Sequence, residues 1–195
     1  MIKNIKNFNI VITGVGGQGL ITLTKIIAET AMIEGYDIKT SELHGLSQKG
    51  GSVQTHIRFG EKIYSPLVSD TTADLIIGLE ISEALRNINF SNSKTNVLVN
   101  EFQLFYIGSL KAEEIVKKLN SLFKERLYLI PASEICEEKF KKEVLSGIYL
   151  FSLAINKKLI PLNFSSGLKA ISNIVPEKYL EVNKQAFKLG QKNNE

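Results

Sequence analysis

Two glycine-rich stretches contain most of the residues whose types and spacing could bind a ligand. In the first, Gly14, Gly16 and Gly19 have the G-x-G-x-x-G spacing and lie between an apolar run and a helical pattern. Glycine allows the tight turn and the close approach that a Cβ would block. The N-terminus of the following helix offers free N–H groups and a partial positive charge, which favour phosphate or another anion. Ligand contact and simple packing of helix on strand both remain open for this loop.

The second stretch is the polar segment from Leu43 to Ser52, directly after Glu42. Its Lys49 is a positive charge that could pair with a phosphate or a carboxylate. Both stretches should follow strands at one edge of a sheet, where ligands of open α/β sheets usually bind. We therefore predict one site, facing a ligand or a partner, with the residues Gly14, Gly16, Gly17, Gln18, Gly19, Glu42, His44, Gly45, Ser47, Gln48, Lys49, Gly50, Gly51 and Ser52.

Reactive groups are scarce around this predicted site. The histidines are His44 and His56, and only Glu42 lies near them as a third metal ligand, so we predict no metal site. The sequence has neither a G-x-S-x-G elbow nor a P-loop. Cys136 is the single cysteine, which excludes a disulfide or a cysteine-ligated cluster within this chain. We expect no catalytic residue and no cofactor here, but a site that completes the pocket of another polypeptide.

A dinucleotide-binding enzyme is the alternative that the glycine spacing suggests. Glu42 lies about where such enzymes carry the carboxylate that binds a ribose. The chain then enters another glycine-rich loop and a strand, whereas a dinucleotide domain would continue with a short loop and a helix. This order weakens the interpretation as a free-standing Rossmann-like dinucleotide-binding oxidoreductase. A non-enzymatic adaptor for a larger subunit is a third interpretation.

The composition is that of a globular protein. The 195 residues are 44% hydrophobic and 23% charged, which suits one domain over residues 1–195. The net charge is +4, but glutamates are interspersed among the lysines, so we expect no nucleic-acid partner. No apolar run approaches the ~20 residues that span a bilayer, and we expect no membrane contact. Scarce cysteine fits a reducing compartment, so we predict a cytoplasmic protein.

Hydrophobic periodicity predicts the elements that position the two stretches. A strand at 10–12 precedes a helix over 20–34 that ends at Gly35, and a strand at 37–41 carries Glu42 and His44 at its end. Residues 53–59 alternate, with His56 on the polar face, and 63–65 should return as the other half of a hairpin. The predicted central strands are 74–79, 96–100 and 127–130, and the intervening helices are 81–87, with Ser82 as a possible cap, and 110–125.

The last third of the chain is predicted to be helical, over 140–155, 165–174 and 176–189. The segment from Val144 to Leu153 is apolar on nearly all sides and must be covered, either within this domain or, as we favour, by a partner. The predicted fold class is α/β, a three-layer Rossmann-like fold. It has a largely parallel sheet with an inserted β-hairpin and a helical C-terminal third.

Five segments together resemble a known family: GVGGQG at 14–19, SELHGLSQKGGSV at 41–53, YSPL at 64–67, ADLIIGLE at 73–80 and the tail at 175–190. Over nearly the full chain, the sequence resembles the small (beta) subunit of indolepyruvate:ferredoxin oxidoreductases and, more broadly, the gamma domain of the 2-oxoacid:ferredoxin oxidoreductases. The second loop looks like the indolepyruvate form, since pyruvate and 2-oxoglutarate enzymes tend to carry a Phe/Tyr-Gly-Pro-Glu-x-Arg-Gly loop. Lys49 stands where the indolepyruvate form often has arginine, which keeps the charge but loses a planar fork.

The resemblance implies oxidative decarboxylation of indolepyruvate or another arylpyruvate to an acyl-coenzyme A (acyl-CoA), with electrons passed to ferredoxin. It also implies a large partner subunit that holds thiamine diphosphate, Mg2+ and 4Fe-4S iron–sulfur clusters, with CoA as co-substrate and this chain inactive alone. The alternative within the family is the gamma subunit of a pyruvate, 2-oxoisovalerate or 2-oxoglutarate enzyme. We hypothesise that loops 14–19 and 44–52 pack on the large subunit and shape its pocket for substrate or CoA. Interface packing alone is the competing interpretation.

Overall fold

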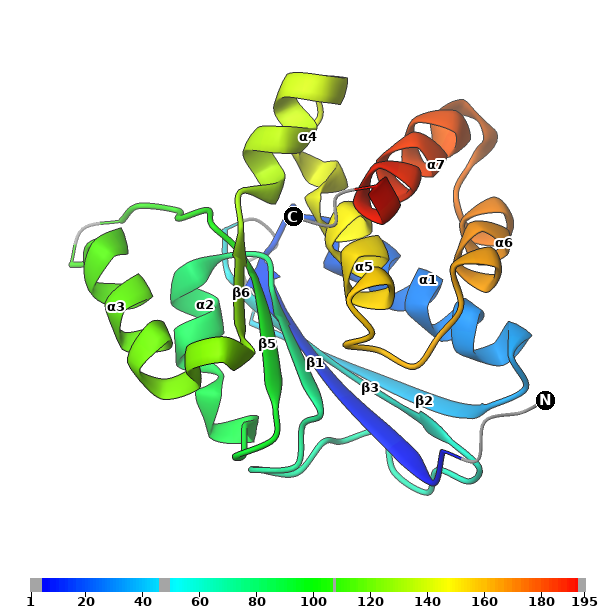
Figure 1. Cartoon of the computed structure of the whole chain (residues 1–195), viewed down its shortest axis with the longest axis horizontal. Helices are drawn as coiled ribbons and strands as arrows, with labels where there is room; N and C mark the ends of the chain where they lie inside the picture. Colours follow the sequence, from blue (N-terminus) through cyan, green and yellow to red (C-terminus); the bar gives the residue numbers. More distant parts are fainter. Residues whose placement is uncertain (1–4, 46–49, 107, 193–195) are drawn as a thin grey trace.

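A six-stranded sheet forms the middle layer of the computed structural model, which describes residues 5–45, 50–106 and 108–192 (Figure 1). The strands, in the spatial order β2-β3-β1-β4-β5-β6, are β1 (Asn7–Val15), β2 (Asp37–His44), β3 (Ser52–Gly60), β4 (Leu75–Gly78), β5 (Asn96–Asn100) and β6 (Leu127–Ile130). The α-helices are α1 (Leu20–Ile33), α2 (Ile81–Arg86), α3 (Ala112–Phe123), α4 (Ala132–Phe140), α5 (Ser146–Asn156), α6 (Phe164–Ile174) and α7 (Glu177–Lys192). Short 3-10 turns are η1 (Ile88–Phe90), η2 (Lys124–Arg126) and η3 (Glu143–Leu145).

The sheet is parallel over four of its strands and antiparallel at one side. β1, β4, β5 and β6 run in the same direction, and β3 pairs antiparallel with both β1 and β2. Parallel strands are covered on both faces, so they consist of continuous apolar runs such as the fully buried Leu75–Gly78. The predicted α/β class, with a largely parallel sheet and a helical C-terminal part, is confirmed.

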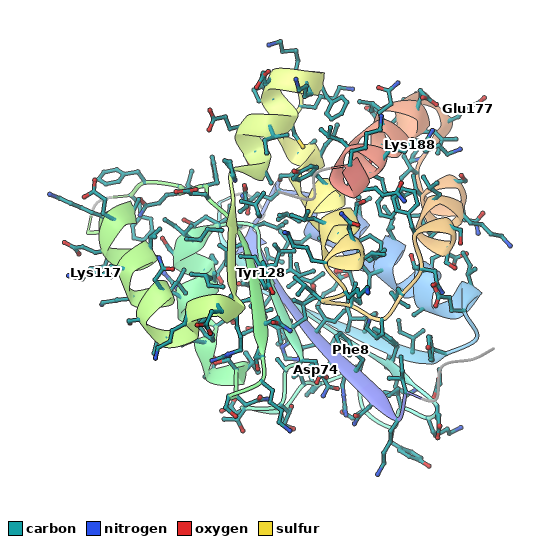
Figure 2. The ribbon with its side chains drawn as sticks, viewed as in Figure 1. Phe8, Asp74, Lys117, Tyr128, Glu177 and Lys188 are labelled. Atoms are coloured by element: carbon teal, nitrogen blue, oxygen red, sulfur yellow. The ribbon has the colours of Figure 1, made fainter. Side chains whose placement is uncertain are left out.

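Each face of the sheet supports its own part of the core. Successive strand residues point to opposite faces, so Val11, Ile76 and Val97 pack with α2 and α3. Ile10, Ile12 and the helices α1, α5, α6 and α7 form the larger cluster on the other face (Figure 1). Side chains fill the space between sheet and helices, whereas Lys117 of α3 and Lys188 of α7 lie on the outside (Figure 2).

The antiparallel hairpin is present, but its strands differ from the predicted pair. β2 and β3 form it, and the second glycine-rich stretch connects them. The prediction that residues 63–65 pair with 53–59 was wrong, because side chains bond the backbone of this segment. The Arg58 guanidinium donates to the carbonyl oxygens of Ser65 (3.0 Å) and Leu67 (3.3 Å), and the Ile63 N–H donates to the Asp37 carboxylate (2.8 Å).

His56 is buried, although the alternation in β3 placed it on a polar face. It is 2% exposed, and its ring meets the Phe90 ring edge-on at 5.1 Å. The Val68 N–H donates to its Nδ1 at 3.0 Å, and burial lowers the pKa of the imidazole. The polar side of β3 is therefore covered by segments that come later in the chain.

Apart from Val144, which is 45% exposed, the apolar stretch at 144–153 is covered by its own chain, so the favoured prediction of a partner there was wrong. α5 begins at Ser146 rather than near residue 140, and a separate helix, α4, precedes it. All residues from Ser146 to Ala154 are buried, and the Phe151 and Phe187 rings of α5 and α7 lie 5.5 Å apart. No helix in the described part of the chain is long and apolar enough to cross a membrane.

Candidate functional site

The two glycine-rich stretches meet at the carboxyl end of β1, as predicted. The Gly16 N–H donates to the Gly51 carbonyl at 2.9 Å, and the Gly50 N–H donates to the Gly16 carbonyl at 3.2 Å. Antiparallel pairing brings them together, because the last residue of β1, Val15, lies opposite the first residue of β3, Ser52. The two stretches, with the neighbouring segment 102–106, are called the rim below.

Backbone geometry explains several of the glycines in the rim. Gly17 (φ 105°), Gly19 (φ 79°) and Gly50 (φ 69°) have left-handed conformations that side chains disfavour. Gly19 is the N-cap of α1, where no side-chain hydrogen bond caps the helix and the first turn contains no acidic residue. This end of α1 therefore keeps the partial positive charge of a helix N-terminus.

Gln18 points into the protein and braces the first loop. Its Oε1 accepts a hydrogen bond from the Val15 N–H at 2.9 Å, and its Nε2 donates to the Leu79 carbonyl at 3.0 Å. A Cβ at Gly14 would lie 2.7 Å from this Oε1, so glycine is needed there for close approach. Gln18 is half-buried and also lines the hollow over Gly16 and Gly17, so its contact with a ligand or a partner stays a prediction.

Two buried carboxylates follow β4 at the same edge of the sheet. Glu80 is 1% exposed and Glu83 is 5% exposed. Glu80, rather than the predicted Ser82, caps α2: its carboxylate accepts from the Glu83 N–H at 2.7 Å and from the Leu104 N–H at 3.2 Å. Burial raises the pKa of Glu80, and these backbone hydrogen bonds oppose the rise.

Glu83 connects the second loop to the segment 102–106. The Ser52 hydroxyl donates to Glu83 Oε2 at 2.5 Å, and Arg86 Nε lies 3.5 Å from Glu83 Oε1. Arg86 in turn donates from Nη2 to the Tyr106 hydroxyl at 3.2 Å. Glu83, Arg86 and Tyr106 were not among the residues predicted for the site. One signal was available, since Glu80, Glu83 and Arg86 are three residues apart on the helix that follows a buried strand.

Three adjoining hollows run along the rim. The hollow between Ser52, Glu83, Arg86 and Tyr106 has a volume of about 250 Å³, and the next, over Gly16 and Gly17, has about 280 Å³. Val15, Gly50 and Leu104 line both of these hollows. A larger apolar hollow of about 560 Å³ between α1, α5 and α7 adjoins the second at Val144. The three hollows thus adjoin one another through shared lining residues.

Of the remaining predicted residues, the structure describes Glu42 and Gly45 in full. Glu42 is exposed on β2 and lies opposite Thr55 of β3. Because β3 separates β2 from β1, Glu42 lies about 10 Å from β1, one strand further away than a ribose-binding carboxylate would lie. Gly45 is exposed at the end of β2, whereas Ser47, Gln48, Lys49 and the side chain of His44 lie outside the described residues.

Three other ionisable side chains, those of His56, Asp74 and Cys136, lie away from the rim. His56 pairs with Val11 in the middle of β1. Asp74, whose pKa burial raises, precedes β4 at the opposite edge of the sheet, where it accepts from the Asn9 N–H at 2.8 Å (Figure 2). Burial raises the pKa of the Cys136 thiol to about 12. Among the described residues, no group of three or more His, Cys, Asp and Glu could hold a metal ion.

The fold and the rim define a Rossmann-like α/β domain whose polar side chains mainly brace its own loops. Residues 9–192 match the family described as pyruvate ferredoxin/flavodoxin oxidoreductase. The indolepyruvate oxidoreductase subunit IorB of Archaeoglobus fulgidus is 35% identical over 188 residues, which cover 93% of this chain and 92% of that protein. The chain therefore belongs to the pyruvate ferredoxin/flavodoxin oxidoreductase family.

Solved structures share the fold. The pyruvate oxidoreductase subunit PORC of Thermotoga maritima matches with a TM-score of 0.70 and 17% identity, over 96% of each chain. The 2-oxoglutarate:ferredoxin oxidoreductase of Magnetococcus marinus, with 2-oxoglutarate, coenzyme A and succinyl-CoA bound, matches with a TM-score of 0.73 and 20% identity. That match covers 96% of this chain and 31% of the longer one, so this fold occurs both as a separate subunit and within a larger chain.

Proposed function

We propose that this chain is the small subunit of an indolepyruvate-type 2-oxoacid:ferredoxin oxidoreductase. The enzyme would decarboxylate indolepyruvate or another arylpyruvate oxidatively, form the acyl-CoA and pass the electrons to ferredoxin. The observation that carries this proposal is the similarity to an indolepyruvate oxidoreductase subunit over 93% of this chain at 35% identity. The described part of the rim is consistent with it, because the side chains of Gln18, Ser52 and Tyr106 are hydrogen-bonded within the domain.

The cofactors of this reaction are assigned to the large partner subunit. Thiamine diphosphate with Mg2+ would activate the oxoacid there, and 4Fe-4S clusters would carry the electrons away. The donor set of this chain does not fit such a cluster, since Cys136 is its single cysteine and is buried. We therefore place no cofactor in this chain and expect it to be inactive alone. A reducing, cytoplasmic location follows from the same assignment.

The rim is the surface that we propose to face the large subunit. Next to the glycine loops, the segment 102–106 exposes Leu104 (40%), Phe105 (74%) and Tyr106 (49%). Exposed aromatic and aliphatic side chains gathered at one place mark interaction surfaces. The uncapped N-terminus of α1 and Lys49 favour the CoA phosphates or the oxoacid carboxylate.

Reconstitution tests the assignment. The chain is co-expressed with a large thiamine- and cluster-bearing subunit, and reduction of ferredoxin is followed with indolepyruvate and CoA. We expect activity from the complex and none from either subunit alone. Turnover of an oxoacid by the isolated chain, or a nucleotide bound to it, would show that it is an enzyme in its own right. Full activity of the large subunit alone would reduce this chain to an adaptor.

Lys49→Ala tests the ligand contact of the second loop. Loss of a charged hydrogen bond should raise the KM for CoA or for the oxoacid about 10-fold to 100-fold. Lys117→Ala is the matched control, because Lys117 lies on the outer side of α3 away from the rim (Figure 2). If Lys49→Ala gives the same KM values as the control, Lys49 has no role in binding either ligand.

A further inference from the structure

The first turn of α2 is hydrogen-bonded to both sides of the hollow between Ser52, Glu83, Arg86 and Tyr106. Glu83 lies in the first turn of α2, and its carboxylate accepts from the Ser52 hydroxyl at 2.5 Å while facing Arg86 Nε at 3.5 Å. Its own N–H donates to the Glu80 carboxylate, which also accepts from the Leu104 N–H. The carboxylate pair thus connects the second glycine loop on one side with the segment 102–106 on the other.

Ser52 is the point where this connection reaches the predicted site. It is the first residue of β3, directly after Gly50 and Gly51, which exchange hydrogen bonds with Gly16 of the first loop. Ser52 itself is exposed, whereas Glu83 is buried and held by the helix. A short hydrogen bond to a carboxylate is stronger than one between neutral groups. The bond therefore ties an exposed loop end to a rigid part of the core.

From this geometry we propose that Glu83 is a positioning residue, which fixes residues 50–52 against the first glycine loop through Ser52. It acts by setting the place of the backbone N–H groups of Gly16 and Gly50. Preorganised loops bind better because less conformational entropy is lost on binding. That part of the inference rests on the proposed function, whereas the structural link between Glu83 and the loops does not.

Amide hydrogen exchange in the full-length chain tests the link directly. Ser52→Ala and Glu83→Ala each remove the bond, and the N–H groups of Gly16 and Gly50 should then exchange about 10-fold to 100-fold faster. Ser52→Thr keeps a hydroxyl donor and Glu83→Gln keeps an oxygen acceptor. In both variants the N–H groups of Gly16 and Gly50 should therefore exchange nearly as fast as in the unaltered chain.

Asn87→Ala is the matched control for this experiment. Asn87 is also buried on α2 and donates to Thr13 Oγ1 at 2.8 Å and to the Glu83 carbonyl at 2.9 Å, without reaching either loop. In Asn87→Ala, the N–H groups of Gly16 and Gly50 should exchange no faster than in the unaltered chain, when both rates are normalised to the exchange of the other β1 N–H groups. Equal acceleration in the control, or none in Ser52→Ala, overturns the inference. Ser52→Ala decides the matter even if Glu83→Ala does not fold, because Ser52 is exposed.

Kinetics of the reconstituted complex test the consequence for binding. Ser52→Ala and Glu83→Ala should each raise the KM for CoA or oxoacid about 10-fold and change kcat less than about twofold, since positioning acts on binding. The double variant should be no worse than Glu83→Ala, because that change already removes the bond to Ser52. Additive effects overturn the inference. An unaltered complex that fails to turn over refutes the proposed function instead, and the exchange experiment still decides the role of Glu83.

Discussion

The brace formed by Gln18 gives the sharpest test of how the first glycine loop is built. Gly14→Ala would place a Cβ 2.7 Å from Gln18 Oε1 and 3.1 Å from the Leu79 Cβ. The Gln18 side chain could move away from this Cβ only by leaving the Val15 N–H and the Leu79 carbonyl. We therefore expect Gly14→Ala to act mainly by breaking the brace.

The magnitude follows from the two hydrogen bonds. The Val15 N–H would lose its partner at a cost of about 1–3 kcal/mol, whereas the Leu79 carbonyl would still accept from Asn100 Nδ2 at 3.0 Å. Gln18→Ala should thus lower the free energy of unfolding by about 2 kcal/mol, and Gly14→Ala by about 3 kcal/mol because of the tight contact with Leu79. For a chain of this length, 2 kcal/mol corresponds to a fall of roughly 4–8 °C in melting temperature.

Urea unfolding of the full chain, followed by circular dichroism, measures these values for both single variants and for the double variant. Because both changes remove the same brace, Gly14→Ala should cost less than about 1.5 kcal/mol when Gln18 is already alanine. If the two costs simply add, Gly14 and Gln18 act independently and the reasoning fails. Lys117→Ala on α3 serves as the surface control and should stay within about 0.5 kcal/mol.

Three further changes test other parts of the fold. Gly190→Ala should lower the free energy of urea unfolding by about 1–3 kcal/mol, because its Cβ would lie 2.6 Å from the Tyr149 carbonyl. Cys136 should react with a thiol reagent only after unfolding, since burial raises its pKa to about 12. Burial lowers the pKa of the His56 imidazole, so the unfolded chain binds more protons than the folded chain below pH ~6.5, and acidification lowers the free energy of unfolding. Between urea titrations at pH values of about 7.5 and 5.5, His56→Asn should therefore lose less of this free energy than the unaltered chain.

Local signals predicted the first half of the fold well. The apolar run of β1, the glycines and the helical spacing of α1 lie next to one another in sequence, and Gly35 has the left-handed φ of 84° typical of a helix end. Strand pairing is a long-range property, so the alternation of β3 did not reveal its partners. Nor did it reveal that Val68 and Phe90 cover His56.

The apolar helix α5 shows a second limit of sequence patterns. An all-round apolar helix must be covered, but the pattern does not say by what. Gly190 provides the answer here, since the absence of a side chain lets α7 pack directly on the backbone of α5 at Tyr149. In the sequence, Gly190 directly follows the predicted helix 176–189 and has the place of an ordinary helix end, whereas α7 continues to Lys192 and uses the glycine for close packing.

For the site, the sequence predicted the meeting of the loops but not what holds them. The positions of Gly16 and Gly51 follow from the order of the strands, because carboxyl ends of parallel strands share an edge. Glu83 and Arg86 belong to a different part of the sequence, more than 30 residues further on, and only the fold brings them to Ser52. The burial of Glu80 and Glu83, which marks them as part of the site, is a property of the folded chain and cannot be read from the sequence.

The internal bonds of the rim decide which changes can report on a partner. Gln18 and Ser52 are bonded inside the domain, so substitutions there alter the shape of the loops and should shift melting temperature and kinetic constants together. Phe105, by contrast, is 74% exposed, and a change to serine should leave the stability of the free chain within about 0.5 kcal/mol. If the large subunit covers the rim, the same change should weaken the complex by 2 kcal/mol or more, roughly 30-fold in Kd. An unchanged Kd would place the partner on another face.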